Sequence, residues 1–339
     1  MKVRLYTDAL KLVEKSGVGQ AVHHQQAMLK RVGVPVAFHS EPDVDIVHIN
    51  TVFPDSVAAA ILAKLRGQMV VYYGHSTMED FRNSFRCSNL LAPLFKCWIK
   101  LCYSIGDVVI TPTEYSRLLL SYGLRRPIYA LSNGIDTDFF SFHQDYRNRF
   151  RAKYHLKEHE KAVISVGHYI QRKGILDFLT LARTMPDVHF FWFGYTNLNL
   201  VPCEVRQAIA NAPDNVIFPG YAEREELRDA YCGCDAFCFM SYEETEGIVV
   251  LEALSCGIPT LLRDIPVYHG WLKNGENVYL AKDLSGFARQ LDNMLHETLP
   301  DISPAARQTA MRHRIPVIGR QLLTIYQQCL SHQPTRVNT

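Results

Sequence analysis

The sequence has almost no excess of either charge, because 36 lysines and arginines nearly balance 34 aspartates and glutamates, for a net charge of +2. Electrostatic binding of nucleic acid needs a basic surplus, so we expect no such partner. Nine cysteines are present without any CxxC pair, which indicates reduced thiols in a cytosolic protein rather than a disulfide framework. We find no run of 18 uncharged apolar residues and no signal peptide, so no membrane-spanning helix is expected.

Several catalytic signatures are also missing. Gly17 and Gly19 lack the third glycine of a GxGxxG fingerprint, which disfavours a nicotinamide-dependent dehydrogenase. HExxH and GxSxG do not occur, so zinc peptidases and α/β-hydrolases are disfavoured as well. The two D-x-D patterns, Asp43–Asp45 and Asp136–Asp138, fall at a strand start and in a turn. We therefore expect no metal site and no resident cofactor.

Apolar, β-branched and aromatic runs alternate with helical stretches along the whole chain, which is typical of parallel α/β sheets covered on both faces. We predict twelve strands, at 3–9, 35–40, 45–50, 69–74, 107–113, 128–133, 162–167, 188–194, 216–220, 236–240, 259–263 and 277–281. These indicate two Rossmann-like, doubly wound domains facing a cleft. The predicted boundaries are 1–140 and 161–314, joined by a polar linker at 141–160. A late helix at 315–331 is expected to return to the first domain.

Two glutamates stand eight residues apart in the segment EETEGIVVLEALSCGIP, which begins at residue 243. Glu252 falls inside a predicted helix that stops near Gly257 and Pro259, whereas Glu244 lies in the loop before it. Helical rise allows up to about 12 Å between the two carboxylates, too far for one metal or a shared proton. This spacing favours one elongated ligand with hydroxyl groups at two places.

Two cations precede a predicted helix in the segment SVGHYIQRKGILDF. Arg172 and Lys173 stand at the helix start, where the helix dipole disfavours positive charge unless an anion is nearby. The strand, loop and helix start therefore predict a diphosphate site, in which Arg would bind two oxygens and Lys would add a point charge. Gly17 and Gly19 are expected in a loop that leads into a second predicted helix, where they indicate another phosphate or sugar contact.

Together these motifs resemble the retaining family 4 glycosyltransferases of GT-B fold. The likeness is carried by SGVG, DIVHIN, SNGID, the RKG helix start and the E-x7-E segment, and it spans essentially the whole chain. HSTMEDFRNSF, SNLLAPLFK and RDIPVYHGWL are similar to bacterial synthases of α-glycosyl-diacylglycerols, especially the branch that adds a second hexose to α-monoglucosyldiacylglycerol.

The resemblance implies roles for named residues. Arg172 and Lys173 would neutralise the leaving diphosphate, Glu244 would hold the donor hexose, and His75 would lie near it. Glu252 would bind the ribose. Further donor contacts are implied for a set of loop and helix-start residues: Gly17, Gly19, Asn133, Gly167, Gly194, Glu246, Gly247 and Ile248. Glu246 stands where the family commonly has phenylalanine, so glucose and galactose both stay open as the transferred sugar.

The implied reaction transfers a hexose from a UDP-sugar to a glycolipid with retention of anomeric configuration. Cleavage leaves an oxocarbenium-like sugar and a diphosphate, whose charge the two cations and helix N–H groups would stabilise. The implied partners are a UDP-hexose, anionic membrane lipids and the glycolipid acceptor. Transfer of the first hexose to diacylglycerol is one alternative. A non-catalytic protein that binds nucleotide sugars at a membrane surface is another.

Residues 88–106 form the segment most suited to a membrane surface. On a helical wheel Lys96 and Lys100 share one side, while Trp98 lies among the apolar residues of the other. Arg82 and Arg86 add positive charge nearby, so this helix could lie on an anionic bilayer. A core helix with solvated lysines has the same periodicity. With the resemblance, we expect a peripheral protein at the cytoplasmic face of the cell membrane.

Overall fold

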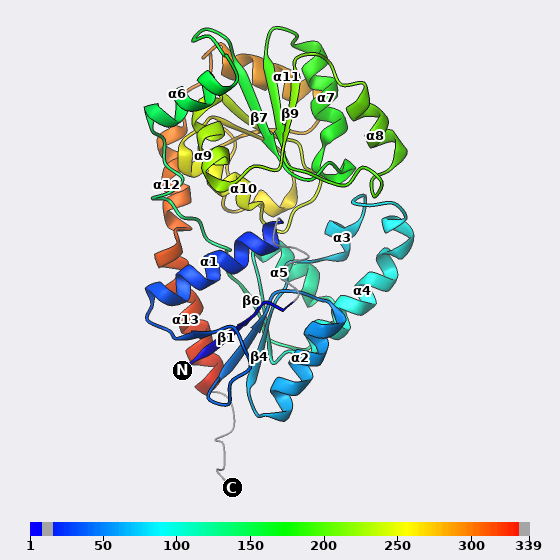
Figure 1. The fold of residues 1–339 in the computed structure, drawn as a ribbon, viewed down its shortest axis with the longest axis vertical. Coiled ribbons are helices and arrows are strands. Elements are labelled where there is room, and N and C mark those ends of the chain that lie inside the picture. The colour runs from blue at the N-terminus through cyan, green and yellow to red at the C-terminus, as the bar shows by residue number, and fades with distance from the viewer. Residues whose placement is uncertain (9–15, 332–339) are drawn as a thin grey trace. The chain divides into compact units, whose positions relative to one another are not determined.

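Two parallel six-stranded sheets organise the chain (Figure 1), for which a computed structural model describes residues 1–8 and 16–331. Each sheet lies in its own compact unit. The first unit combines residues 1–78, 93–134 and the chain from 313 onward, and the second combines residues 79–92 and 135–312. The unit boundary near residue 134 lies before the predicted position at 140.

The first sheet has the strand order β2-β1-β3-β4-β5-β6, and neighbouring strands pair in parallel. Its strands are β1 (Val3–Tyr6), β2 (Val36–Ala37), β3 (Ile46–Ile49), β4 (Met69–Tyr73), β5 (Val108–Thr111) and β6 (Ile128–Ala130). Every residue of β1, β3, β4 and β5 is buried, as expected for strands covered on both faces.

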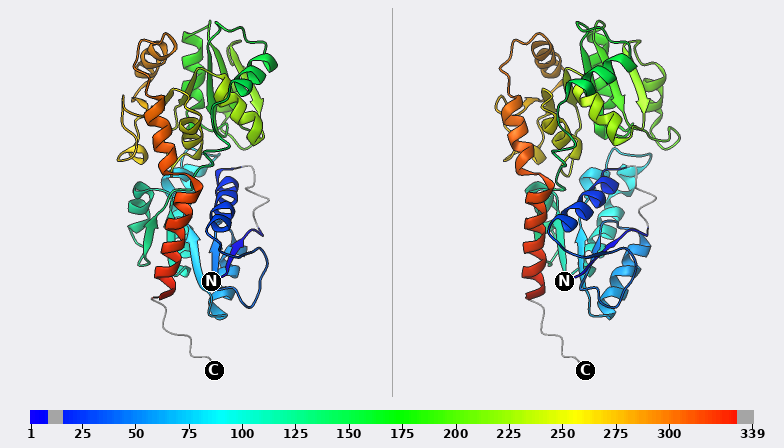
Figure 2. Two further views of the ribbon diagram at one scale, coloured as in Figure 1. Left: turned by 90° about the vertical axis from the view of Figure 1, so that its left-hand side faces the viewer. Right: turned by 60° about the vertical axis from the view of Figure 1, so that its left-hand side comes forward.

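Successive side chains of these strands enter two different cores, because strand residues alternate between the faces of a sheet. Val71 and Tyr73 of β4 pack with helices α1 (Gly17–Arg31) and α13 (Ile315–Ser331). Val70 and Tyr72 pack with α2 (Pro54–Leu65), α4 (Ser88–Ile105) and α5 (Glu114–Ser121). The late helix thus packs in the first unit, and α13 lies alongside α1 (Figure 2).

The second sheet has the order β12-β11-β10-β7-β8-β9, also parallel throughout. Its strands are β7 (Ala162–Val166), β8 (His189–Phe193), β9 (Val216–Gly220), β10 (Ala236–Phe239), β11 (Thr260–Arg263) and β12 (Tyr279–Ala281). All twelve predicted strands are therefore confirmed, as is the prediction of two doubly wound parallel sheets.

Helices cover both faces of the second sheet. One face packs on α7 (Ile175–Thr184), α8 (Cys203–Ala210) and α11 (Leu284–Leu295) around Phe178, Phe190 and Trp192. On the other side lie α6 (Gln144–Lys153), α9 (Arg224–Gly233), α10 (Ile248–Cys256) and α12 (Ser303–Arg312). The described residues also contain three short helices: α3 (Met78–Phe81), η2 (Gln171–Lys173) and η3 (Pro266–Tyr268).

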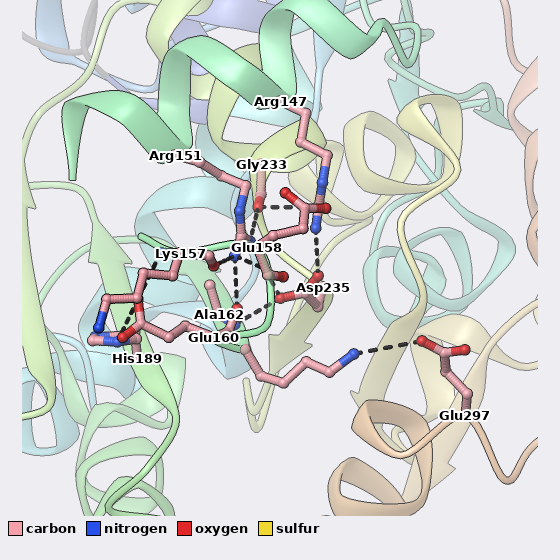
Figure 3. Close-up of polar contacts among 11 residues, drawn as sticks. Arg147, Arg151, Lys157, Glu158, Glu160, Ala162, His189, Gly233, Asp235 and Glu297 are labelled. Atoms are coloured by element: carbon pink, nitrogen blue, oxygen red, sulfur yellow. Dashed lines mark hydrogen bonds and ion pairs between the residues drawn. The ribbon is translucent and has the colours of Figure 1, made fainter. Parts of the chain in front are cut away.

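The segment predicted as a linker, 141–160, contains helix α6, which is attached within the second unit by ion pairs (Figure 3). Arg147 lies 3.0 Å from the Asp235 carboxylate, and Arg151 lies 3.6 Å from it while donating to the Gly233 carbonyl oxygen. Asp235 in turn accepts the Ala162 N–H, where β7 begins. Apolar periodicity does not reveal this helix, because ion pairs with Asp235 help to attach it to the rest of the second unit.

Candidate active site

Most of the predicted donor residues lie in the second unit, at the carboxyl ends of its strands. Gly167 follows β7, Gly194 follows β8, and Glu244 follows β10. Parallel α/β sheets bind their ligands at this edge, where loops from several strands meet.

Two glycines allow the strand ends to approach one another closely. Gly194 has a φ of 131°, and a Cβ atom there would lie 2.1 Å from the Gly167 carbonyl oxygen. Gly174 has a φ of 79°, and a Cβ atom there would lie 2.2 Å from the Met240 carbonyl oxygen. No other residue type fits either position without moving backbone. The second contact sets η2, with both predicted cations, against the end of β10.

Lys173 and Glu244 form the centre of the site. Lys173 Nζ lies 2.5 Å from Glu244 Oε1, and its side chain also packs beside Gly167. Glu244 is only 6% exposed. Burial by itself would raise the pKa of Glu244, but the charges of Lys173 and Arg172 outweigh burial and lower it. Glu244 is therefore an ionised carboxylate held beside two cations.

Arg172 is held in one orientation by several contacts. Its Nη1 donates to the Glu243 carbonyl oxygen at 2.6 Å and lies 2.8 Å from the Asp80 carboxylate. Its Nε donates to Ser84 Oγ at 3.1 Å, and its backbone N–H donates to the Asn83 carbonyl oxygen. Residues 79–92, which belong to the second unit, therefore position the arginine that sequence analysis assigned to the diphosphate.

Glu252 belongs to a separate hydrogen-bond pair. It lies inside α10, is buried, and accepts a hydrogen bond from the Tyr231 hydroxyl on α9 at 3.0 Å. Burial raises the pKa of Glu252 to about 7, although the Tyr231 hydrogen bond and the Arg224 charge act in the opposite direction. The two glutamates of the E-x7-E segment thus contact different partners, as two ends of one long ligand would require.

The remaining donor residues of this unit lie at the start of α10. Gly247 is its N-terminal cap residue, and within the described chain no side chain caps this end. Ile248 begins the helix, and Glu246, which precedes Gly247, is buried. Uncapped N–H groups at a helix start are an anion-binding arrangement.

Four of the residues predicted to contact the sugar donor lie in the first unit instead: Gly17, Gly19, His75 and Asn133. His75 follows β4, where its Nε2 lies 2.8 Å from Asn50 Oδ1 and its ring stacks on Tyr73. Burial lowers the pKa of His75 to about 3, so the imidazole is neutral. The Asn133 carbonyl oxygen contacts His24 Nδ1 of α1 at 3.2 Å.

Gly17 and Gly19 were expected in a loop, but they form the first turn of α1. The reason is local, because Ser16 caps the helix by accepting the Val18 N–H at 3.2 Å. A Cβ atom on Gly17 would meet nothing within 4 Å, so this helix start has open space beside it. The chain just before Ser16 lies outside the described residues.

Comparison with known proteins decides the family. Residues 25–139 match the model of Glycosyltransferase Family 4, and residues 146–313 match that of glycosyl transferases group 1. The processive diacylglycerol alpha-glucosyltransferase of Acholeplasma laidlawii is 38% identical over 333 residues, covering 97% of this chain and 99% of that protein. The chain belongs to the family 4 glycosyltransferases.

Two further proteins extend this comparison. The alpha-galactosylglucosyldiacylglycerol synthase of Streptococcus pneumoniae is 27% identical over 67% of this glycosyltransferase and 62% of its own length. The crystal structure of Anabaena HepE with UDP and glucose superposes with a TM-score of 0.77 at 17% identity, covering 96% of this chain and 99% of that one. The two parallel sheets are thus those of a GT-B enzyme.

The helix assigned to the membrane surface, α4, exposes leucines as well as lysines. Lys96 and Lys100 are exposed, as are four leucines on the same helix: Leu90, Leu91, Leu94 and Leu101. Trp98 was expected at the bilayer surface, but it is half-buried and its indole N–H donates to the Val52 carbonyl oxygen at 2.6 Å. Arg82 and Arg86 are exposed on the preceding segment. Among the described residues, no helix is long and apolar enough to span a bilayer.

Sequence analysis of this glycosyltransferase missed three side chains of the site. Asp80 pairs with Arg172, Tyr231 bonds Glu252, and Tyr268 lies buried beside the start of α10. Asp80 and Tyr268 each stand within a segment that carried the family resemblance, HSTMEDFRNSF and RDIPVYHGWL, which was the available signal. Tyr231 lies in no such segment, and it reaches Glu252 from a different helix.

Of the two D-x-D patterns, Asp136 has a structural role, since its Oδ1 accepts the Phe139 N–H at 3.1 Å. Asp45 similarly accepts the Lys2 N–H at 2.8 Å. Within residues 1–8 and 16–331, no group of three or more metal-binding side chains comes together.

Proposed function

We propose that this enzyme transfers glucose from UDP-glucose to diacylglycerol, forming an α-monoglucosyldiacylglycerol. The observation that supports this acceptor is the 38% identity, over nearly the whole length of both chains, to a protein named as a diacylglycerol alpha-glucosyltransferase. Sequence analysis favoured addition of the second hexose, but this relative favours the first. Because its name includes the word processive, the first product is a natural second acceptor to test.

The chemistry of the donor follows from the buried charges. Breaking the bond from the anomeric carbon to phosphate leaves its electron pair on a diphosphate oxygen. Arg172, Lys173 and the N–H groups at the start of α10 supply positive potential for that oxygen. Glu244 stays ionised beside the cations, where it can accept hydrogen bonds from the hexose hydroxyls.

Glu252 suits the opposite end of the donor. Within the described residues, the Glu252 carboxylate is buried and accepts one hydrogen bond, from the Tyr231 hydroxyl, so it retains acceptor capacity for the two ribose hydroxyls. HepE, which has the same fold, was crystallised with UDP and glucose, in keeping with a UDP-sugar as the donor here.

Retention of configuration follows from the linkages. UDP-glucose carries its diphosphate in the α configuration, and the relative's name specifies an α-glucosyl product. The acceptor hydroxyl would then attack from the side of the leaving group, and the departing phosphate would take up the hydroxyl proton. No enzyme carboxylate is needed as the base in this scheme. His75, held neutral, lies on a strand end of the first unit and is assigned to the hexose.

Radiolabelled transfer tests the proposal directly. The purified enzyme is incubated with labelled UDP-glucose or UDP-galactose and with either diacylglycerol or α-monoglucosyldiacylglycerol, and the lipids are separated. We expect label in monoglucosyldiacylglycerol from UDP-glucose and diacylglycerol. Glu244→Ala and Arg172→Ala should each abolish product, whereas Glu276→Ala, at an exposed surface pair with Lys273, should not.

Two outcomes would contradict the proposal. Label that appears only when α-monoglucosyldiacylglycerol is supplied would assign the enzyme to the second transfer. Absence of lipid label with either donor and either acceptor would refute glycolipid synthesis altogether.

We further infer that α4 binds the inner face of the cell membrane, where the lipid acceptor lies. Exposed leucines would enter the interfacial region, while Lys96 and Lys100 would meet anionic headgroups. Each lysine near such a surface contributes about 1 kcal/mol. The double variant Lys96→Glu, Lys100→Glu should therefore weaken binding to anionic liposomes at least tenfold while leaving UDP affinity unchanged.

A matched control makes the same charge change elsewhere. Lys157 and Lys273 are exposed lysines of the second unit, and Lys157→Glu with Lys273→Glu should leave liposome binding close to wild type. Equal losses in both double variants would show that net charge, not α4, determines binding.

A further inference from the structure

Tyr268 is a buried phenol whose hydroxyl has no hydrogen-bond partner among the described residues. It ends the short helix η3 after β11, and its side chain is 1% exposed. Its backbone is fixed, because its N–H donates to the Ile265 carbonyl oxygen and its own carbonyl oxygen accepts the Leu272 N–H. The Trp271 ring packs edge-on against its ring at 6.1 Å. A buried polar group without a hydrogen-bond partner lowers the stability of the folded state, so we expect the Tyr268 hydroxyl to bind a ligand.

The hydroxyl lies at the start of α10. A Cβ atom built on Gly247 would be 3.4 Å from the Tyr268 hydroxyl oxygen and 3.9 Å from the Phe239 ring. Lys173 Nζ stands 5.2 Å from the centre of that same Phe239 ring. Gly247, Phe239 and Lys173 therefore connect the phenol to the cation pair, and α10 is nine residues long with no side-chain cap in the described structure.

Burial and the neighbouring carboxylates keep the Tyr268 phenol protonated. Burial, followed by the negative charges of Glu244 and Glu243, raises the pKa of Tyr268 well above its usual value, while the Arg172 charge opposes them. A neutral phenol among carboxylates can stabilise an anion only by donating its O–H. Its location therefore suits an anion that reaches the α10 start, where the N–H groups and Lys173 already provide positive potential.

We propose that the Tyr268 hydroxyl donates a hydrogen bond to the diphosphate oxygen that leaves the sugar. This inference rests on the proposed function. As the bond between the anomeric carbon and that oxygen breaks, the electron pair stays on the oxygen and the Tyr268 hydrogen bond strengthens. The phenol keeps its proton, and the oxygen takes up the proton of the acceptor hydroxyl. Tyr268 is thus a catalytic residue that acts on developing charge.

The test compares Tyr268→Phe with Tyr279→Phe. Both changes delete one buried tyrosine hydroxyl in the same unit, but the Tyr279 hydroxyl donates to the Pro300 carbonyl oxygen at 2.6 Å, away from the site. For Tyr268→Phe we expect kcat to fall about 100-fold, with a small change in the KM for UDP-glucose and a modest loss of UDP affinity by calorimetry. Tyr279→Phe should keep the wild-type kcat.

Melting temperatures separate catalysis from folding. Because the Tyr268 hydroxyl has no partner, Tyr268→Phe should melt at or above the wild-type temperature, whereas Tyr279→Phe should melt lower. A wild-type kcat in Tyr268→Phe, or a change confined to KM, would overturn the inference. If the wild-type enzyme bound no UDP, the proposed function itself would fail, so the two failures are distinguishable.

Discussion

Glu244 and Glu252 belong to one segment, but their surroundings shift their pKa values in opposite directions. Both are buried, yet the pKa of Glu244 is lowered because Lys173 and Arg172 adjoin it, whereas burial raises the pKa of Glu252 to about 7 and outweighs the opposing effects of Tyr231 and Arg224. Groups whose surroundings push their pKa values apart are typical of functional sites. Near neutral pH, Glu244 is therefore ionised, whereas Glu252 is close to half protonated in the ligand-free protein.

The raised pKa of Glu252 predicts a pH dependence of stability. The pKa of Glu252 is about 7 in the folded state, against an ordinary 4.5. The contribution of this carboxyl group to folding stability is therefore fully present below pH 4.5 and is lost as pH rises through 7. The ligand-free wild type should therefore lose stability relative to Glu252→Gln between pH 5 and pH 8, by roughly 2–4 kcal/mol. Thermal unfolding at both pH values measures this difference.

Glu225→Gln provides the control, since Glu225 is exposed on the surface of α9. Its stability relative to wild type should change little between the two pH values. If Glu252→Gln behaved in the same way, the carboxylate would not be titrating in the folded protein near neutrality.

Residue types and spacing singled out Arg172, Lys173, Glu244 and Glu252 as candidates, because cations at a helix start and paired glutamates are unusual in themselves, and the structure brings the first three together. The side chains that complete the site were not predictable in this way. Nothing in residue type or spacing sets Tyr231 and Tyr268 apart from other tyrosines, and only the fold brings their hydroxyls to α10. Such contacts between distant segments leave no local pattern.

At the scale of elements, hydrophobic periodicity predicted the strands, which are held by apolar burial, and missed the helices that are held by ion pairs. All twelve strands were found, because each is a short apolar run with β-branched or aromatic residues. Helix α6 was taken for a linker, since Arg147 and Arg151 attach it through Asp235. The short helix α3 is a similar case, with Asp80 joining it to Arg172 by an ion pair.

Asp80→Asn should separate two effects of that ion pair. Asp80 and Glu244 together offset the charges of Arg172 and Lys173, so removing one carboxylate makes the site more attractive to a diphosphate. We expect the Kd for UDP to fall roughly five- to tenfold, or ~1 kcal/mol. Turnover should fall as well, because Arg172 loses one of the groups that orient it. Calorimetry and the transfer assay measure the two quantities.

Glu79→Gln is the matched control on the same short helix. Glu79 adjoins Asp80 in sequence but forms no ion pair within the described structure. An unchanged Kd in Asp80→Asn, or an equal gain in Glu79→Gln, would show that the Asp80 charge does not oppose the diphosphate.

At the scale of the whole molecule, the first unit depends on the end of the chain. Helix α13 contributes six buried apolar residues to the core that covers one face of the first sheet: Ile315, Ile318, Leu322, Ile325, Tyr326 and Cys329. Side chains of this kind contribute about 1.5–3 kcal/mol each when fully buried. Their sum is comparable to the entire stability of a domain, about 5–15 kcal/mol.

Leu322→Ala should therefore destabilise the first unit by about 2–5 kcal/mol, because it leaves a cavity at a fully buried position. Hydrogen exchange should quicken in β1, β3 and β4 while the second sheet keeps its protection. Gln321→Ala, on the exposed side of the same helix, should alter neither. Equal acceleration in both sheets would show that the two units do not unfold independently.

The polypeptide passes between the two units four times, near residues 78, 92, 134 and 312, and one passage lies inside α4. A protease that nicks any one of these junctions still leaves three covalent tethers. Neither half can be released as a free fragment by a single cut, and neither can be expressed as one uninterrupted stretch of the gene.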